Sequence, residues 1–308
     1  MQTTISNINE DFNNSQDITT GVKRASALSI IECPRDAMQG WPHFIPTNKK
    51  IQYINALLKC GFNILDFGSF VSPKAIPQMA DTTTVLKSLE LENTNTKLLA
   101  IIANERGAEE AVGYDQISFL GFPFSISETF QQRNTNSSVN ESLKRVENIQ
   151  ELCFKNNKEL VVYISMGFGN PYGDKYNDEI VIFRTKQIAD LGIKIISIAD
   201  TVGLATADEV SSLMKIIIPQ FPNVEIGVHL HSLPDNREQK LEAAIAAGCK
   251  RFDAALKGIG GCPMAGNDLV GNMDTEIMIN YFKKKGYDLN IDNAALRKCS
   301  LMAAEIFV

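Results

Sequence analysis

Short apolar segments recur along the chain, and longer segments with helical periodicity separate them. Eight of these short segments are rich in β-branched and other apolar residues, which is typical of strands that are buried on both faces. The predicted strands are LSIIECP (28–34), NILDFGSF (63–70), KLLAIIAN (97–104), QISFLGF (116–122), ELVVYISM (159–166), KIISIAD (194–200), EIGVHLH (225–231) and RFDAALKG (251–258).

The intervening segments carry the start and stop signals of helices. Thr47 precedes an apolar stripe and Gly61 closes it, which predicts a helix with Thr47 as its N-cap. Two further segments begin with a serine or threonine and a glutamate three residues later, the spacing of a capping box. These pairs are Ser138 with Glu141 and Thr206 with Glu209, and the last helical segments that the pattern predicts are 237–248 and 275–286.

A strand followed by a helix, eight times over, predicts a parallel sheet with helices on its outside. The simplest arrangement of eight such units is a sheet closed into a (β/α)8 TIM barrel. This fold needs about 250 residues, and the chain has 308. We therefore expect a single barrel domain over residues 27–308, with a doubly wound open sheet as the structural alternative. Residues 1–26 are polar and lack the apolar core of a signal peptide, so we expect a flexible tail.

Composition places the chain among soluble globular proteins, with 44% hydrophobic and 21% charged residues. A net charge of −6 without a long basic block argues against nucleic acid or an anionic membrane surface as the main partner. The longest apolar runs are too short to span a bilayer. The cysteines are scattered without a C-x-x-C pair, so we expect reduced thiols and a cytoplasmic protein; they are Cys33, Cys60, Cys153, Cys249, Cys262 and Cys299.

Candidate chemistry lies where a barrel would place it, at the C-terminal ends of the strands. The first predicted strand leads into Arg35 and Asp36, the second contains Asp66, and the eighth runs into the glycine-rich segment 258–272. The seventh ends in a His-x-His motif, and residues two apart on a strand project to the same side. Both imidazoles can therefore face one point near the mouth of the barrel.

Two converging imidazoles favour a divalent cation. With Asp36 and Asn272 as oxygen donors beside His229 and His231, a site with two nitrogen and two oxygen ligands is plausible. Such a set suits Mg²⁺ or Mn²⁺ with further oxygens from substrate or water, and Zn²⁺ is less favoured because no thiolate is needed.

Six motifs in order carry a resemblance to a known family. They are PRDAMQ (34–39), DFGSFVSPKAIPQMAD (66–81), SETFQQRNTNSSVNES (127–142), ISIADTVG (196–203), GVHLH (227–231) and GIGGCPMAGNDLVGN (258–272). This set resembles the 3-hydroxy-3-methylglutaryl-CoA lyases, metal-dependent carbon–carbon lyases built on TIM barrels, from about Ile30 to the C-terminus. The resemblance implies cleavage of that acyl-CoA to acetyl-CoA and acetoacetate, as in leucine degradation and ketone body metabolism.

The resemblance also implies roles for residues of this chain. Arg35 would neutralise the enolate charge that forms as the bond breaks, and proton transfer would fall to His229 or Asp36. Asp66 stands at a position where the family has glutamate, and Cys262 lies on the loop expected to cover the site. The implied metal ligands are Asp36, His229, His231 and Asn272.

Two departures from the family pattern put the substrate in question. Asp66 is one methylene shorter than glutamate, so we expect it to fall short of Arg35 or of a metal-bound water. Ser232-Leu233-Pro234 replaces an acidic residue and a threonine, which would remove a carboxylate that orients an imidazole.

Several alternatives stay open at this point. The chain could be a Claisen-type acyl-CoA synthase or an aldolase, or a non-catalytic barrel that binds metal and acyl-CoA. Asp200 could support the site or simply form a turn, and His43 is expected at the surface or in a lid. A homodimer is a further expectation, because many barrels associate through their outer helices.

Overall fold

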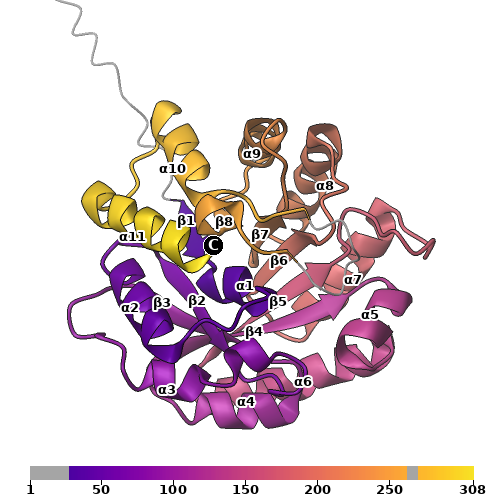
Figure 1. Cartoon of the computed structure of the whole chain (residues 1–308). Helices are drawn as coiled ribbons and strands as arrows, with labels where there is room; N and C mark the ends of the chain where they lie inside the picture. The colour runs from indigo at the N-terminus through magenta and orange to yellow at the C-terminus, as the bar shows by residue number, and fades with distance from the viewer. Residues whose placement is uncertain (1–27, 262–269) are drawn as a thin grey trace, which may run out of the picture.

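Eight parallel strands form a closed barrel in this computed structural model, which describes residues 28–261 and 270–308 (Figure 1). The strands follow one another around the barrel in chain order, and β1 closes it by pairing with β8. The TIM barrel is thereby confirmed and the open sheet excluded. The strands are β1 Ser29–Glu32, β2 Ile64–Ser69, β3 Lys97–Ile101, β4 Ile117–Ser125, β5 Glu159–Ser165, β6 Ile195–Asp200, β7 Glu225–Leu230 and β8 Arg251–Ala254.

Helices surround the barrel, and α1 lies across its end near the centre of the view (Figure 1). A helix that the sequence pattern did not predict, α11, follows the segment expected to be the last, and it packs against α2. The helices are α1 Pro34–Gln39, α2 Thr47–Leu57, α3 Thr82–Leu86, α4 Glu105–Val112, α5 Glu128–Thr135, α6 Val139–Lys155, α7 Asp178–Asp190, α8 Ala207–Gln220, α9 Arg237–Ala246, α10 Thr275–Lys284 and α11 Asn293–Ile306, with short 3-10 turns η1 Pro77–Met79 and η2 Leu256–Gly258.

The predicted capping boxes of α6 and α8 are both present, with the reciprocal bonds expected from their spacing. The prediction for α2 is wrong at its first residue. Pro46 is the N-cap, because Thr47 already belongs to the helix and its hydroxyl donates to Asp81 Oδ2 at 2.7 Å. The polar tail 1–26 and the thiol of Cys262 lie outside the described residues, and the division into a tail and a domain of residues 27–308 stays a prediction.

Side chains alternate between two buried layers along each strand, as the period of a strand requires. One layer fills the barrel and includes Ile31, Leu99, Val161 and Ile195. The other layer packs between the strands and the surrounding helices. Polar residues at inward positions near the C-terminal strand ends therefore converge on the mouth of the barrel, which is where the candidate chemistry lies.

The side chain of Glu32 points away from the barrel interior, toward the surrounding helices, and it is fully buried. Its carboxylate accepts hydrogen bonds from the Leu256 backbone N–H at 2.9 Å and from Thr275 Oγ1 at 2.5 Å. Burial raises the pKa of Glu32 to about 8, and the Thr275 hydroxyl offsets part of that rise. The side chain is therefore mostly protonated at neutral pH in the folded protein.

The described cysteines are buried and unpaired, as expected for reduced thiols. The Sγ atoms of Cys60 and Cys299 lie 3.5 Å apart.

In the part of the chain that the structure describes, no helix combines the length and the apolar character needed to cross a membrane.

Candidate active site

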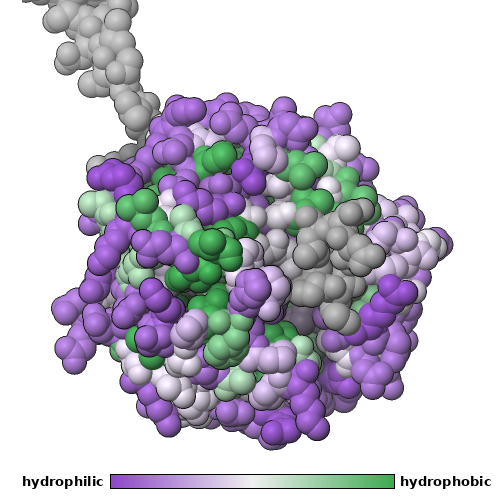
Figure 2. All heavy atoms as spheres, viewed as in Figure 1, coloured by the Kyte–Doolittle hydropathy of each residue, from purple (hydrophilic) through white to green (hydrophobic). Residues whose placement is uncertain are grey.

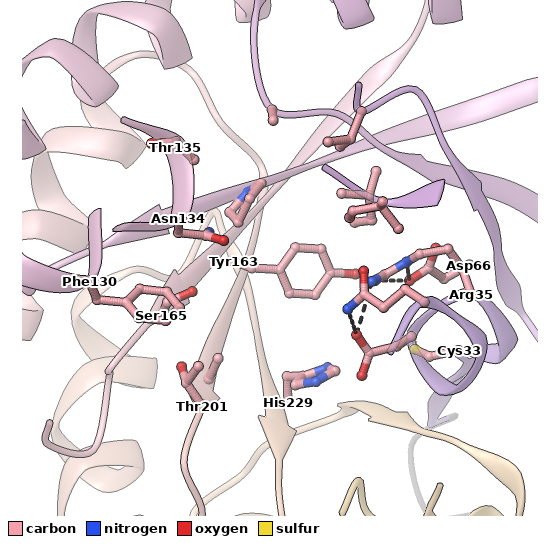
Figure 3. Close-up of a pocket in the computed structure, with 18 of the residues that line it drawn as sticks. Cys33, Arg35, Asp66, Phe130, Asn134, Thr135, Tyr163, Ser165, Thr201 and His229 are labelled. Carbon is pink, nitrogen blue, oxygen red and sulfur yellow. Dashed lines mark hydrogen bonds and ion pairs between the residues drawn. The ribbon is translucent and has the colours of Figure 1, made fainter. Parts of the chain in front are cut away.

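A cavity of about 430 Å³ opens at the mouth of the barrel (Figure 3). Inward-facing residues of the strand ends line it, together with α1, α5 and the segment after β2. Figure 2 shows this face with hydrophobic residues gathered toward its centre and hydrophilic residues around its periphery. The strand-end lining residues include Cys33, Asp66, Ile101, Tyr163, Ser165, Ala199, Thr201, His229 and His231.

Arg35 and Asp36 lie on the first turn of α1, directly after β1 and not within the strand itself. Pro34 starts this helix, where its missing N–H costs nothing. Arg35 donates from Nε and Nη2 to Asp66 at 2.5–3.2 Å, and from Nη1 to Asp36 Oδ1 at 2.9 Å. The expectation that Asp66 falls short of Arg35 is therefore wrong, because β2 brings the shorter side chain close enough for a two-pronged ion pair.

The charges in this group stabilise one another in a nearly dry environment. Burial raises the pKa of Asp66 to about 6, although Arg35 pulls it down, so its carboxylate is ionised at neutral pH. Burial also acts to raise the pKa of Asp36, but Arg35 and the two imidazoles outweigh it and the pKa is lowered overall. Arg35 remains protonated because its two carboxylates outweigh the cost of burial and raise its pKa.

Asp36, His229 and His231 form a group in which one ligand atom of each residue lies within 4.8 Å of the others. Asn272 joins this group, since its Nδ2 donates to Asp36 Oδ2 at 2.7 Å and to the Ile259 carbonyl at 2.9 Å. Its Oδ1 is buried and has no hydrogen-bond partner in the described residues. A buried acceptor without a donor is costly, and a cation at this point would satisfy it. Asp36, His229 and His231 therefore form a group that could hold a metal ion, with the unpartnered oxygen of Asn272 on a residue bonded to that group.

His229 is oriented by a carboxylate that the sequence analysis did not identify. Its Nδ1 lies 3.3 Å from Oδ2 of Asp253, a buried residue of β8, which leaves Nε2 for a cation. Burial lowers the pKa of His229, but the bond to Asp253 and its charge outweigh this and the pKa is raised. Asp253 thus supplies from β8 the orienting carboxylate that the Ser232-Leu233-Pro234 segment was expected to remove.

The backbone of His231 is fixed by a buried lysine. Lys240 of α9 donates to the His231 carbonyl and to Asp200 Oδ2, each at 2.8 Å. Asp200 also accepts from the Ala205 backbone N–H at 3.1 Å, so it both shapes its turn and supports the site through Lys240. Burial and the neighbouring His229 lower the pKa of His231 to about 3, so its imidazole is neutral and able to act as a ligand.

Glycines shape the segment that leads from η2 toward the site. Gly258, Gly260 and Gly261 have φ values of +64°, +105° and +139°, in the region that side-chain-bearing residues rarely adopt. A Cβ on Gly260 would lie 2.5 Å from Asn272 Nδ2 and 3.0 Å from the Asp36 carbonyl. Gly260 therefore lets the backbone pass close to two of the candidate ligands, Asn272 and Asp36.

The far wall of the cavity is built by α5, which contributes Phe130, Arg133, Asn134 and Thr135. Figure 3 shows Phe130, Asn134 and Thr135 across the cavity from Arg35 and Asp66. Among the lining residues that the structure describes, Arg35 and Arg133 carry a permanent positive charge, and the charge of Arg35 is balanced by Asp36 and Asp66. Arg133 is therefore the cation available to an anionic ligand on this side.

Sequence signals for the missed residues existed. Asp253 and Arg251 are charged residues two apart on a strand, which places both on the same face of β8. Lys240 stands on the apolar face of α9 beside Leu241 and Ala244. His43 is exposed and does not line the cavity, which agrees with a surface position.

Comparison with known proteins gives consistent relatives. Residues 28–302 match the family model described as HMGL-like. The chain is 31% identical over 260 residues to a hydroxymethylglutaryl-CoA lyase of Bacillus subtilis, covering 84% of this chain and 85% of that one. It is 30% identical over 268 residues to a cytoplasmic 3-hydroxy-3-methylglutaryl-CoA lyase of Danio rerio, covering 86% and 78% of the two chains.

A solved structure of an HMG-CoA lyase from Acinetobacter baumannii, in complex with coenzyme A and 3-methylmalate, is similar over almost the whole barrel. The two share 30% identity with a TM-score of 0.84, and the match covers 91% of each chain.

Proposed function

The chain belongs to the HMGL-like family, and on this premise we propose that it cleaves 3-hydroxy-3-methylglutaryl-CoA to acetyl-CoA and acetoacetate. The observation that carries the proposal is the donor set of Asp36, His229, His231 and Asn272 directly beside Arg35. The names of the relatives from Bacillus subtilis and Danio rerio support the same reaction.

A divalent cation in this donor set, for which we propose Mg²⁺ or Mn²⁺, would polarise the hydroxyl and carboxylate oxygens of the substrate. The tertiary hydroxyl must give up its proton, and we propose that Asp36 or His229 takes it, without dividing the role between them. The hydroxyl oxygen then becomes the ketone oxygen of acetoacetate as the carbon–carbon bond breaks. The electron pair of that bond moves onto the thioester, which becomes an enolate and takes up a proton at carbon to give acetyl-CoA.

We assign the stabilisation of that enolate to Arg35. Nε, one N–H of Nη1 and one N–H of Nη2 donate to Asp36 and Asp66, which leaves one N–H on each terminal nitrogen. The two carboxylates fix the plane of the guanidinium before substrate arrives, and a preoriented donor costs no reorganisation during the reaction. Cys262, which lies outside the described residues, is proposed to act from the loop over the site.

The test uses metal-stripped protein incubated with 3-hydroxy-3-methylglutaryl-CoA, with Mg²⁺ and Mn²⁺ added separately and acetoacetate measured. We expect acetoacetate only after metal is restored, and none from His229→Ala with either metal. Full turnover by His229→Ala, or no turnover by the wild-type protein with any divalent metal, would contradict the proposal.

A second candidate is a different hydroxy acid as substrate. The structure from Acinetobacter baumannii was solved with coenzyme A and 3-methylmalate, a smaller hydroxy acid. In this alternative the enzyme carries out a Claisen-type condensation or an aldol cleavage on another acid. Consumption of acetyl-CoA with a 2-oxo acid, without turnover of 3-hydroxy-3-methylglutaryl-CoA, would favour it. A protein that binds metal and acyl-CoA without turnover would favour the non-catalytic alternative.

We propose the cytoplasm as the compartment, although relatives carry both cytoplasmic and mitochondrial in their names. Leucine degradation and ketone body metabolism remain the proposed context. The homodimer also stays a prediction, which light scattering of the purified protein would test.

A further inference from the structure

The N-terminus of α5 is held by a carboxylate from another part of the chain. Asp174 lies in the segment between β5 and α7, and its Oδ2 accepts from Ser127 Oγ at 2.5 Å and from the Thr129 backbone N–H at 2.9 Å. Its Oδ1 accepts from Thr129 Oγ1 at 2.9 Å. The Ser127 hydroxyl, Thr129 N–H and Thr129 hydroxyl together lower the pKa of Asp174, against a small effect of burial, so these bonds involve an ionised carboxylate.

The segment that carries Asp174 is itself fixed by one asparagine. Asn170 Oδ1 accepts from the backbone N–H groups of Tyr172 and Asp174, at 3.0 and 3.1 Å, and its Nδ2 donates to the Asp174 carbonyl at 3.0 Å. The Asp174 carboxylate is thus presented to α5 from a turn with a defined shape.

A second set of contacts joins the same two segments through Tyr172. Its ring stacks on Phe130 with centroids 6.4 Å apart. The guanidinium carbon of Arg133 lies 4.7 Å from the centre of the same ring, a cation–π contact. The segment 170–174 therefore contacts α5 at its N-cap, at Phe130 and at Arg133.

These contacts matter because α5 is short and faces the cavity. It spans Glu128–Thr135, and four of its residues line the cavity opposite Arg35 and Asp66. A helix this short is marginal by itself, so its position depends on tertiary contacts. A shift at its N-terminus would move Arg133 and Asn134 relative to the metal-ligand group.

We infer that Asp174 is a positioning residue that holds α5 so that Arg133 and Asn134 face the acyl-CoA substrate. The inference rests on the proposed function, because acyl-CoA is the anionic ligand expected at this wall. Asp174 does not line the cavity. It acts through α5, so its loss changes substrate binding and leaves the bond-breaking group of Arg35, Asp36 and His229 in place.

The experiment compares Asp174→Ala with the wild-type protein by calorimetric titration with coenzyme A and by steady-state kinetics with 3-hydroxy-3-methylglutaryl-CoA. We expect Kd for coenzyme A and KM to rise on the order of tenfold, equivalent to about 1.4 kcal/mol, with kcat within about twofold of wild type, in keeping with loss of uniform binding. Asp174→Asn keeps one acceptor oxygen, so its Kd and KM should lie between those of the wild type and those of Asp174→Ala.

Asp292→Ala is the matched control. Asp292 caps α11 through the backbone N–H groups of Ala294 and Ala295, and neither it nor α11 lines the cavity. We expect this variant to lose a similar amount of thermal stability and to keep Kd and KM. A merely structural role for Asp174 would give the two alanine variants the same kinetics.

The outcomes separate the inference from the proposed function. Unchanged Kd and KM in Asp174→Ala, or a fall in kcat alone, overturns the inference while an active wild type upholds the function. A wild type that neither binds coenzyme A nor cleaves the substrate overturns both. If Asp174→Ala does not fold, Asp174→Asn decides the matter, and wild-type Kd and KM in that variant likewise overturn the inference.

Discussion

Replacing Asp253 by asparagine should weaken binding of a divalent cation while leaving the barrel folded. The carboxylate lies 3.3 Å from His229 Nδ1 and also accepts from Ser197 Oγ at 3.2 Å. It favours the tautomer with a proton on Nδ1, which leaves the Nε2 lone pair for the cation. An asparagine has the same shape but offers an amide donor as well, so the wrong tautomer becomes accessible.

The size of the effect follows from the nature of this contact. Asp253 is 2% exposed, so water cannot replace the lost acceptor. Loss of a carboxylate behind a ligating histidine typically costs 10–100-fold in metal affinity, which corresponds to about 1.4–2.8 kcal/mol. We therefore expect the Kd for Mn²⁺ to rise by about that factor in Asp253→Asn.

Titration calorimetry of metal-stripped protein with Mn²⁺ measures this directly and does not depend on turnover. Ser197→Ala is the matched control, because it removes a donor to the same carboxylate oxygen without touching His229. We expect it to change the Kd by a smaller factor. Wild-type Mn²⁺ affinity in Asp253→Asn would refute the assignment of Asp253 as the orienting group.

Three further predictions concern other contacts. Arg35→Lys keeps the charge but loses the two-pronged bond to Asp66, so acetoacetate formation should fall by about 10²–10³-fold, and near-normal activity would rule out the role given to the guanidinium. Lys240→Met leaves Asp200 buried without its partner and should destabilise the protein by about 3–5 kcal/mol, measured by urea unfolding, while an unchanged midpoint would show the pair to be dispensable. Glu32, with its pKa raised from 4.5 to about 8, binds a proton in the folded state, so its contribution to stability is full below pH 4.5 and is lost as pH rises toward 8. Glu32→Gln should remove that loss, so its free energy of unfolding should rise relative to that of the wild type by about 1 kcal/mol per pH unit over this interval. A difference in urea midpoints that does not change with pH would contradict this prediction.

Local sequence patterns were sufficient for the barrel and for part of the site. Strand periodicity places residues two apart on one face, so His229 and His231 could be assigned to a common point from β7 alone. Seven of the observed strands lie within the predicted segments, and the eighth, β4, overlaps its segment and extends three residues beyond it. The capping boxes of α6 and α8 are equally local, because both partners lie three residues apart.

Contacts between residues far apart in the chain could not be predicted from such local patterns. Asp66 was expected to miss Arg35 because a side-chain length was compared without the separation of β1 and β2. Asp253, Lys240 and Asp174 act on residues 24, 9 and 45–47 positions away, and no periodicity links such pairs. The missed α11 is different, since Asp292 is a recognisable N-cap in front of it.

The sequence by itself determined which residue types stand at the strand ends, and that alternating strands and helices must bury a parallel sheet, because both follow from residue type and short-range period. The tertiary structure decided how those groups are held. Closure of β1 onto β8 brings Asp36, His229, His231 and Asn272 together, and burial combined with the neighbouring charges shifts the pKa values of Asp36, His229 and His231. Such distances and solvation depend on the packing of the whole barrel, which no local pattern encodes.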